Sequence, residues 1–241
     1  MKQQAGGTVE GALTRRLVRI NLVAAVGFIL GGTLFALGAV FAQLGVGSVV
    51  TVNITYLMGG FFFSLGGYVS ILLVINDACD QSPRSTVAPM RWWSYSRHRR
   101  DWRSAVVLFT GTLFFAVSLV AAFAQGLTPR QSNGWIWFPD IVGCVCFLAS
   151  GHLAMLEVGD GRVGVQLHYL AWWVVAVNQL GSILFFLAGV AAFTRPATST
   201  ALNEGLVNWG TFAGAVCFAL GGITQAFDKP TSTRTVVQHT P

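Results

Sequence analysis

The chain has 241 residues, of which 54% are hydrophobic and only 10% are charged, and its formal net charge is +6. Ordinary soluble domains carry about 25% charged residues, so this composition excludes a soluble globular protein. It indicates an all-α, polytopic membrane protein.

Six apolar stretches, each long enough to cross a bilayer as one helix, follow one another along the chain. They are Asn21–Leu44, Ile54–Ile75, Ser104–Ala124, Ile136–Val158, Tyr169–Phe193 and Asn208–Phe227. We expect six transmembrane helices arranged as three tandem helical hairpins, at 21–75, 104–158 and 169–227. An N-terminal segment (1–20), a basic loop (76–103) and a tail (228–241) complete the chain. The first apolar run is too long for the core of a cleavable signal peptide.

Basic residues predict which side of the membrane each loop faces. The terminal segments and the loops at 76–103 and 159–168 hold 13 of the 15 Lys and Arg residues, and only Arg130 and Arg195 fall on the other side. Cytoplasmic loops carry such an excess of positive charge. We therefore expect a multi-pass protein of the plasma membrane with both termini in the cytoplasm.

Each apolar stretch contains a glycine, a phenylalanine four residues later and a small residue three positions beyond. The Gly and Phe pairs are Gly31/Phe35, Gly59/Phe63, Gly111/Phe115, Gly143/Phe147, Gly181/Phe185 and Gly214/Phe218. Residues at this spacing share one face of a helix, and small residues let membrane helices approach closely. We expect these faces to pack helix against helix, each Phe filling the groove beside a neighbouring glycine. An aromatic-lined ligand groove is the alternative.

The second, fourth and sixth stretches align without gaps on Gly59, Gly143 and Gly214, and Asn53 then coincides with Asn208. This pattern indicates a hairpin repeated three times in the same orientation, unlike the inverted repeats common in secondary transporters. The unit resembles the YrhK-like domain, a two-helix bacterial membrane module, best over residues 172–228. That resemblance implies a bacterial multi-pass membrane protein and no particular activity.

Two acidic residues lie within the fourth stretch. Asp140 follows Pro139 near its outer end, where a carboxylate caps a helix N-terminus; the alternative is a vestibule that attracts cations. Glu157 lies at the inner end, where solvation or pairing with an arginine is the simpler explanation. Ionisable groups in membrane helices are costly and often functional, so both are candidate site residues.

Three further polar residues lie inside the predicted helices. His152 is expected to donate a hydrogen bond between helices. A proton relay to Glu157 is disfavoured because the two residues lie on different helix faces, and a haem site because only His152 is clearly intramembrane. Asn178 and Gln179 lie near the bilayer midplane, where a polar group must find a partner. Hydrogen bonding between helices is the first interpretation, and a site for an ion or a polar headgroup is the alternative.

No metal site or cofactor is predicted. Cys144, Cys146 and Cys217 lie within helices, where cysteine packs as a small apolar residue, and Cys79 lies in a cytoplasmic loop. The absence of lysine from the apolar stretches excludes a retinal-type Schiff base. Neither a phosphate-binding loop nor a nucleophile beside a base is evident, so no catalytic residues are proposed.

The basic loop interleaves arginine with tryptophan, a composition typical of segments that lie on anionic headgroups. We expect lipid contacts from Arg91, Trp92, Trp93, Arg97, Arg99, Arg100, Trp102 and Arg103. Segment 77–89 is expected to be a flexible linker, and the tail from Lys229 to be disordered. The expected partners are the bilayer, its anionic lipids and either another protein or further copies of this chain, but no nucleic acid.

Packing motifs outnumber reactive residues, which favours a non-enzymatic membrane protein that acts as a scaffold or accessory subunit. The alternative is a small transporter or channel-like protein with a polar path near Asn178, Gln179 and His152. A membrane enzyme or lipid-handling protein is a third, less favoured class.

Overall fold

The computed structural model describes residues 2–80 and 89–228, so most of the predicted linker and of the predicted tail lies outside the described residues, as does the side chain of Cys79. The described part is an all-α protein with six helices long and apolar enough to span a membrane. The elements are α1 (Lys2–Leu44), α2 (Val49–Asp80), α3 (Arg100–Ala121), α4 (Pro129–Ser132), the π-helical turn η1 (Asn133–Trp137), α5 (Phe138–Val158), α6 (Leu170–Ala191) and α7 (Glu204–Phe227).

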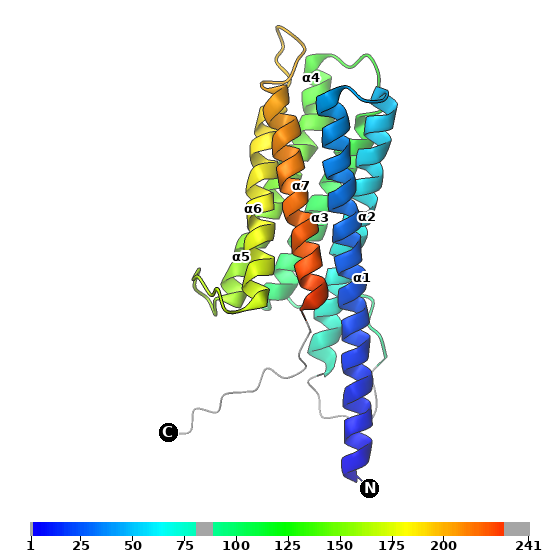
Figure 1. The fold of residues 1–241 in the computed structure, drawn as a ribbon, viewed down its shortest axis with the longest axis vertical. Helices are drawn as coiled ribbons and strands as arrows, with labels where there is room; N and C mark the ends of the chain where they lie inside the picture. The colour runs from blue at the N-terminus through cyan, green and yellow to red at the C-terminus, as the bar shows by residue number, and fades with distance from the viewer. Residues whose placement is uncertain (1, 81–88, 229–241) are drawn as a thin grey trace.

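The long helices form a closed ring. Packing joins α1 to α2, α2 to α3, α3 to α5, α5 to α6, α6 to α7 and α7 back to α1. Figure 1 shows α1 and α7 side by side, although they are the first and last helices of the chain. The ring brings the beginning of α1 and the end of α7 to the same end of the molecule.

Polar caps and glycine turns set where several helices begin. Gly45 and Gly47 adopt positive φ of 64° and 82° in the tight connection between α1 and α2, a conformation that glycine adopts without steric cost. The Asn203 side chain accepts a hydrogen bond from the Leu206 N–H and so caps α7.

The fourth membrane helix begins earlier than its apolar run predicts. Thr128 and Gln131 form a reciprocal capping box at the start of α4, with Pro129 in the first turn. α4, η1 and α5 then continue as one helical span over Pro129–Val158. Asp140 lies in the first turn of α5 but inside this continuous span, so it does not cap the start of the span.

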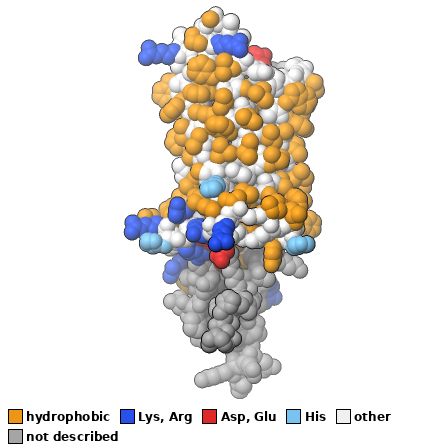
Figure 2. All heavy atoms as spheres, turned by 90° about the vertical axis from the view of Figure 1, so that its left-hand side faces the viewer, with side chains coloured by type: hydrophobic (Ala, Val, Ile, Leu, Met, Phe, Trp, Pro, Cys, Tyr) orange, Lys and Arg blue, Asp and Glu red, His pale blue; other side chains and the backbone are white. Residues whose placement is uncertain are grey.

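The outer surface of the ring is suited to lipid. Large apolar side chains such as Phe61, Leu113 and Val120 are at least half exposed, at 61%, 50% and 61%. Figure 2 shows one face as a broad band of hydrophobic side chains bounded by charged residues at both ends. We call the end with the arginines of 91–103 and 162 the basic end, and the end with the α1–α2, α3–α4 and α6–α7 connections the far end.

Candidate functional site: two cavities separated by a phenylalanine cluster

One phenylalanine from each membrane helix meets at the centre of the ring. These six residues, called here the phenylalanine cluster, are Phe35, Phe63, Phe115, Phe147, Phe185 and Phe218, and each is no more than 6% exposed. They are the phenylalanines of the repeated sequence pattern. Six side chains that are far apart in the chain thus form a single aromatic core.

The phenylalanine cluster has two layers. Phe63, Phe147 and Phe218 form a triangle with ring centroids 5.0, 5.6 and 5.9 Å apart. In the other layer, Phe185 lies 6.0 Å from Phe35 and 6.1 Å from Phe115. Contacts such as the stacked pair Phe115–Phe147, at 5.1 Å, join the layers. Offset and edge-to-face ring pairs of this kind are favourable beyond the area they bury.

Glycines bring the phenylalanines into the ring. A Cβ added to Gly143 would collide with the ring of Phe115, and one added to Gly214 would collide with the ring of Phe185. The same Cβ of Gly214 would lie 2.9 Å from the carbonyl oxygen of Gly181. Gly143 and Gly214 therefore leave the space that a neighbouring helix and its phenylalanine occupy.

A cavity of about 300 Å³ lies on the far-end side of the phenylalanine cluster, and side chains from all six helices line it. Its floor is the layer of Phe35, Phe115 and Phe185. We call it the far cavity. Its polar lining residues include Asn53, Tyr56, Ser118, Asp140, Asn208 and Thr211.

A second cavity, of about 250 Å³, lies on the other side and is called here the basic-end cavity. Phe63, Phe147 and Phe218 line it. Its polar lining residues include Ser70, Asp101, Ser104, Glu157, Asn178 and Gln225. Between the two cavities lies a void of about 10 Å³, lined mainly by the phenylalanine cluster. A void of that size holds at most about one water molecule, and its apolar walls offer too few partners for one.

Residues at corresponding positions of the three predicted hairpins surround the same cavity. Tyr56, Asp140 and Thr211 each precede the pattern glycine by three residues, and all three line the far cavity. On the other side, the corresponding residues Ser70, Ala154 and Gln225 line the basic-end cavity.

Residues at another corresponding position of the three predicted hairpins form hydrogen bonds to the neighbouring hairpin. Asn53 donates to the carbonyl of Ala122 at 2.8 Å. The corresponding Trp137 donates through Nε1 to Gly189 at 2.9 Å, and Asn208 donates to Gln43 at 3.1 Å. Each bond connects one predicted hairpin to the next around the ring, at the rim of the far cavity.

Asp140 is the only charged residue in the described lining of the far cavity. Its Oδ2 lies 3.1 Å from the place that a Cβ on Gly189 would take, so the carboxylate reaches across the α5–α6 contact. Among the described residues no hydrogen bond or ion pair to this carboxylate occurs. The alternative interpretation, a vestibule that attracts cations, agrees with this position.

The other polar residues predicted for an intramembrane site do not come together. Asn178 and Glu157 line the basic-end cavity, on the opposite side of the phenylalanine cluster from Asp140. His152 is exposed on the outer surface, so it lies outside both cavities. The exposed position of His152 does not fit a path through the centre of the ring.

Hydrogen bonding between helices does not explain the polar pair in α6. Gln179 packs against Gly151 of α5, and its buried Oε1 has no hydrogen-bond partner in the described part of the chain. The Asn178 side chain points at Gly221 of α7 and makes no hydrogen bond to another described residue. Asn178 also lines the basic-end cavity, which agrees with the alternative of a site.

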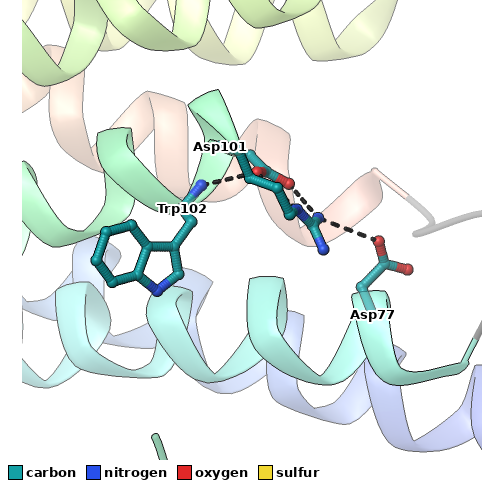
Figure 3. A network of polar contacts seen from close by, with 4 residues as sticks. Asp77, Asp101 and Trp102 are labelled. Atoms are coloured by element: carbon teal, nitrogen blue, oxygen red, sulfur yellow. Dashed lines mark hydrogen bonds and ion pairs between the residues drawn. The ribbon is translucent and has the colours of Figure 1, made fainter. Parts of the chain in front are cut away.

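An ionic network lies at the mouth of the basic-end cavity (Figure 3). The Asp101 carboxylate accepts hydrogen bonds from the Arg99 guanidinium and, at 2.7 Å, from the Trp102 N–H. Arg99 also lies 4.0 Å from Asp77 at the end of α2. The Asp101 hydrogen bond raises the pKa of Arg99 above its ordinary value.

Two of the residues predicted to contact headgroups lie elsewhere. Trp102 is only 6% exposed and donates through Nε1 to the Ser94 carbonyl at 2.9 Å. Arg99 is half-buried in the network described above. The remaining residues of that prediction are exposed: Arg91, Trp92, Trp93, Arg97, Arg100 and Arg103.

Sequence reasoning missed two structural asparagines at the basic end. Asn21 of α1 donates to the carbonyl of Gln225 at 2.9 Å and accepts from the amide of the same residue, also at 2.9 Å. Asn76 is fully buried and bonds the backbone N–H and carbonyl of Arg91. Asn21 is the first residue of a predicted apolar stretch and Asn76 directly follows another, so a search for polar residues deep inside those stretches passes over both.

Comparison with known proteins adds no relative: no family model, curated protein or solved structure matches this chain. The resemblance to the YrhK-like domain remains a prediction. The site therefore has to be interpreted from its own geometry.

Proposed function

We propose that this protein is a small transporter or channel-like protein whose passage runs through the centre of the six-helix ring. The observation that supports this most is the pair of cavities on opposite sides of the phenylalanine cluster. All six helices line each cavity, so both lie inside the ring. Together they leave only the two aromatic layers between one end of the bundle and the other.

The phenylalanine cluster acts as the gate of this passage. A hydrophobic constriction blocks ions and polar solutes because they cannot shed their water there without replacement ligands. Small rotations of the rings, or movement of one hairpin against the others, would widen it. The polar groups beside the gate, Asp140 on one side and Asn178 on the other, give a solute a place to pause.

The basic end faces the cytoplasm in this proposal. Exposed Arg97, Arg100 and Arg103 lie at that end, as expected for cytoplasmic loops and for contact with anionic lipid headgroups. The far cavity then opens toward the external side, and the basic-end cavity toward the cytoplasm.

A scaffold or accessory subunit is the less favoured function. Its motivation was the set of Gly/Phe faces, but these faces pack against one another inside the ring. They therefore offer no surface to a protein partner. A scaffold would need another surface, and the outer face of the ring is apolar, as suits lipid (Figure 2).

Flux measurements on the purified full-length chain in liposomes test the proposal. We expect uptake above that of empty vesicles for at least one member of a panel of small cations, anions and neutral solutes. The proposal fails if every solute crosses protein-containing and empty vesicles at the same rate in the presence and absence of a membrane potential.

A further inference from the structure

We propose that the far cavity binds a small organic cation, with Asp140 supplying the negative charge and aromatic rings supplying the walls. As a statement about the transported substrate, this inference rests on the proposed function. As a statement about binding, it rests on the cavity alone. Charge, position, wall chemistry and volume each contribute to it.

The charged residues that line the cavities indicate the charge of the ligand. The chain is basic overall, with a net charge of +6. Yet the described lining of the two cavities contains no Lys, Arg or His, and its charged residues are Asp140, Asp101 and Glu157. Asp101 is already paired with Arg99 at the basic end, whereas Asp140 lines the far cavity and no described basic residue lines it. Such a lining repels anions and attracts cations.

Position makes Asp140 the group that a ligand would meet. It lies inside the membrane span Pro129–Val158, at the position where the other predicted hairpins carry Tyr56 and Thr211. All three of these side chains border the far cavity. A carboxylate without a countercharge is costly within a membrane, and none of the described residues provides one. A bound cation would provide it.

Wall chemistry selects the class of cation. Aromatic side chains line the far cavity on several sides: Phe35, Tyr56, Phe115, Trp137 and Phe185. The faces of such rings attract ammonium groups, and aromatic cages bind quaternary ammonium ligands in this way. A hard metal ion instead requires about six oxygen ligands. No group of three or more His, Cys, Asp or Glu residues that could hold a metal occurs in the described part of the chain.

Volume limits the size of the ligand. At about 300 Å³ the far cavity lies at the lower end of the range of small-molecule sites, roughly 300 to 1,000 Å³. It suits a compact alkylammonium ion. Gly189 contributes to this space, because a side chain there would press against the Asp140 carboxylate.

Equilibrium binding of radiolabelled tetraethylammonium and choline to the full-length chain in detergent tests the inference. We expect saturable binding that Asp140→Asn weakens by about tenfold or more, because the only charge in the described cavity lining is lost. Glu204→Gln is the matched control, since it removes a carboxylate that is exposed at the same end of the molecule. It should leave binding unchanged.

Tyr56 provides a second test that keeps the charge. Tyr56→Leu removes the ring and leaves Asp140 in place, so it should bind less tightly than the wild type. The inference is overturned if the wild type shows no saturable binding or if Asp140→Asn binds as tightly as the wild type. It is also overturned if 3,3-dimethylbutan-1-ol, the neutral analogue of choline, or an equal concentration of sodium displaces the bound cation as well as choline does.

Binding and flux separate this inference from the proposed function. Saturable binding that depends on Asp140, in a protein that supports no flux of any solute, overturns the passage and leaves the site. Flux that is the same for the wild type and Asp140→Asn, with no binding by either, overturns the site and leaves the passage.

Discussion

Glycine and phenylalanine have complementary roles at the centre of this molecule. The pattern glycines leave gaps for the paired helix. A phenylalanine ring occupies the gap in cases such as Phe185 beside Gly214, and backbone of the partner helix occupies it at Gly31 and Gly59. Association of membrane helices depends on such close packing, because lipid already satisfies apolar side chains. The sequence pattern is therefore explained by the contact between two helices.

Gly214→Ala tests this role at one residue. The added methyl group would meet the Phe185 ring and the carbonyl of Gly181, both on α6. Overpacking of this kind should lower the free energy of unfolding by about 1–3 kcal/mol. Thermal unfolding in detergent measures the change. Gly134→Ala is the control, because nothing lies within 4 Å of its added Cβ. Equal stability of the two variants would contradict the packing role.

The glycine and phenylalanine positions could be predicted from sequence because their spacing matches one helix face. The position of Asp140 inside the bundle could not be predicted from sequence in this way, because it depends on residues that precede the apolar stretch. The polar sequence from Thr128 to Gln131 extends the helix outward by a capping box, and this moves Asp140 from the expected helix end into the bundle. A prediction based on the length of the apolar run alone misses a first helical turn that is made of polar residues.

At the scale of whole elements, hydrogen bonds near both ends of α7 join it to α1 and contribute to the closure of the ring. At the basic end Asn21 joins α1 to the last turn of α7, and at the far end Asn208 joins α7 back to α1. The first and last helices are thus tied together at both ends. Closure depends on pairing between distant elements, so the periodicity of single helices does not predict it.

Asn21→Ala tests the closure of the ring. The substitution removes the bonds between Asn21 and Gln225 and leaves the Gln225 amide without this partner. We expect a loss of stability of about 1–2 kcal/mol and faster proteolysis near the end of α7. Thr110→Ala is the control, since among the described residues the Thr110 hydroxyl bonds to Val106 of its own helix alone. If both variants unfold at the wild-type temperature, the Asn21 contact does not hold the ring.

The Thr128 capping box provides a separate test at the start of the fourth membrane helix. Thr128→Ala removes the side-chain acceptor for the Gln131 N–H and should cost about 1 kcal/mol of stability. Thr128→Ser retains a hydroxyl and should restore most of it. Thermal unfolding of the two variants compares them directly. Equal loss in both would show that the hydroxyl is not the stabilising group.

At the scale of the whole molecule, composition predicted the six membrane helices and the all-α fold, because apolar length and scarce charge leave few alternatives. The arrangement around a central pair of cavities required the structure. It depends on which face of each helix points inward, and the exposed His152 shows that a polar residue in a membrane helix can face outward instead.

We also predict how the whole molecule is oriented in the membrane, with the basic end on the cytoplasmic side. Full-length variants carrying Ser199→Cys, in the α6–α7 connection, or His98→Cys, at the basic end, place a thiol at an exposed position. In intact cells a membrane-impermeant maleimide should label the Ser199 variant, and the His98 variant only after permeabilisation. The unsubstituted chain controls for its own cysteines. Labelling in the opposite order would reverse the assignment of the two ends.

The central claim is that the phenylalanine cluster closes a passage, and solute flux through a widened cluster tests it most directly. Phe63 is 3% exposed within the cluster, while Phe61 of the same helix is 61% exposed on the outer surface. In liposomes, Phe63→Ala should raise the flux of small cations by about tenfold or more over the wild type, because a hydrophobic gate has been opened. Phe61→Ala should match the wild type. If Phe63→Ala remains folded and its flux equals that of Phe61→Ala, the aromatic layers do not gate a passage.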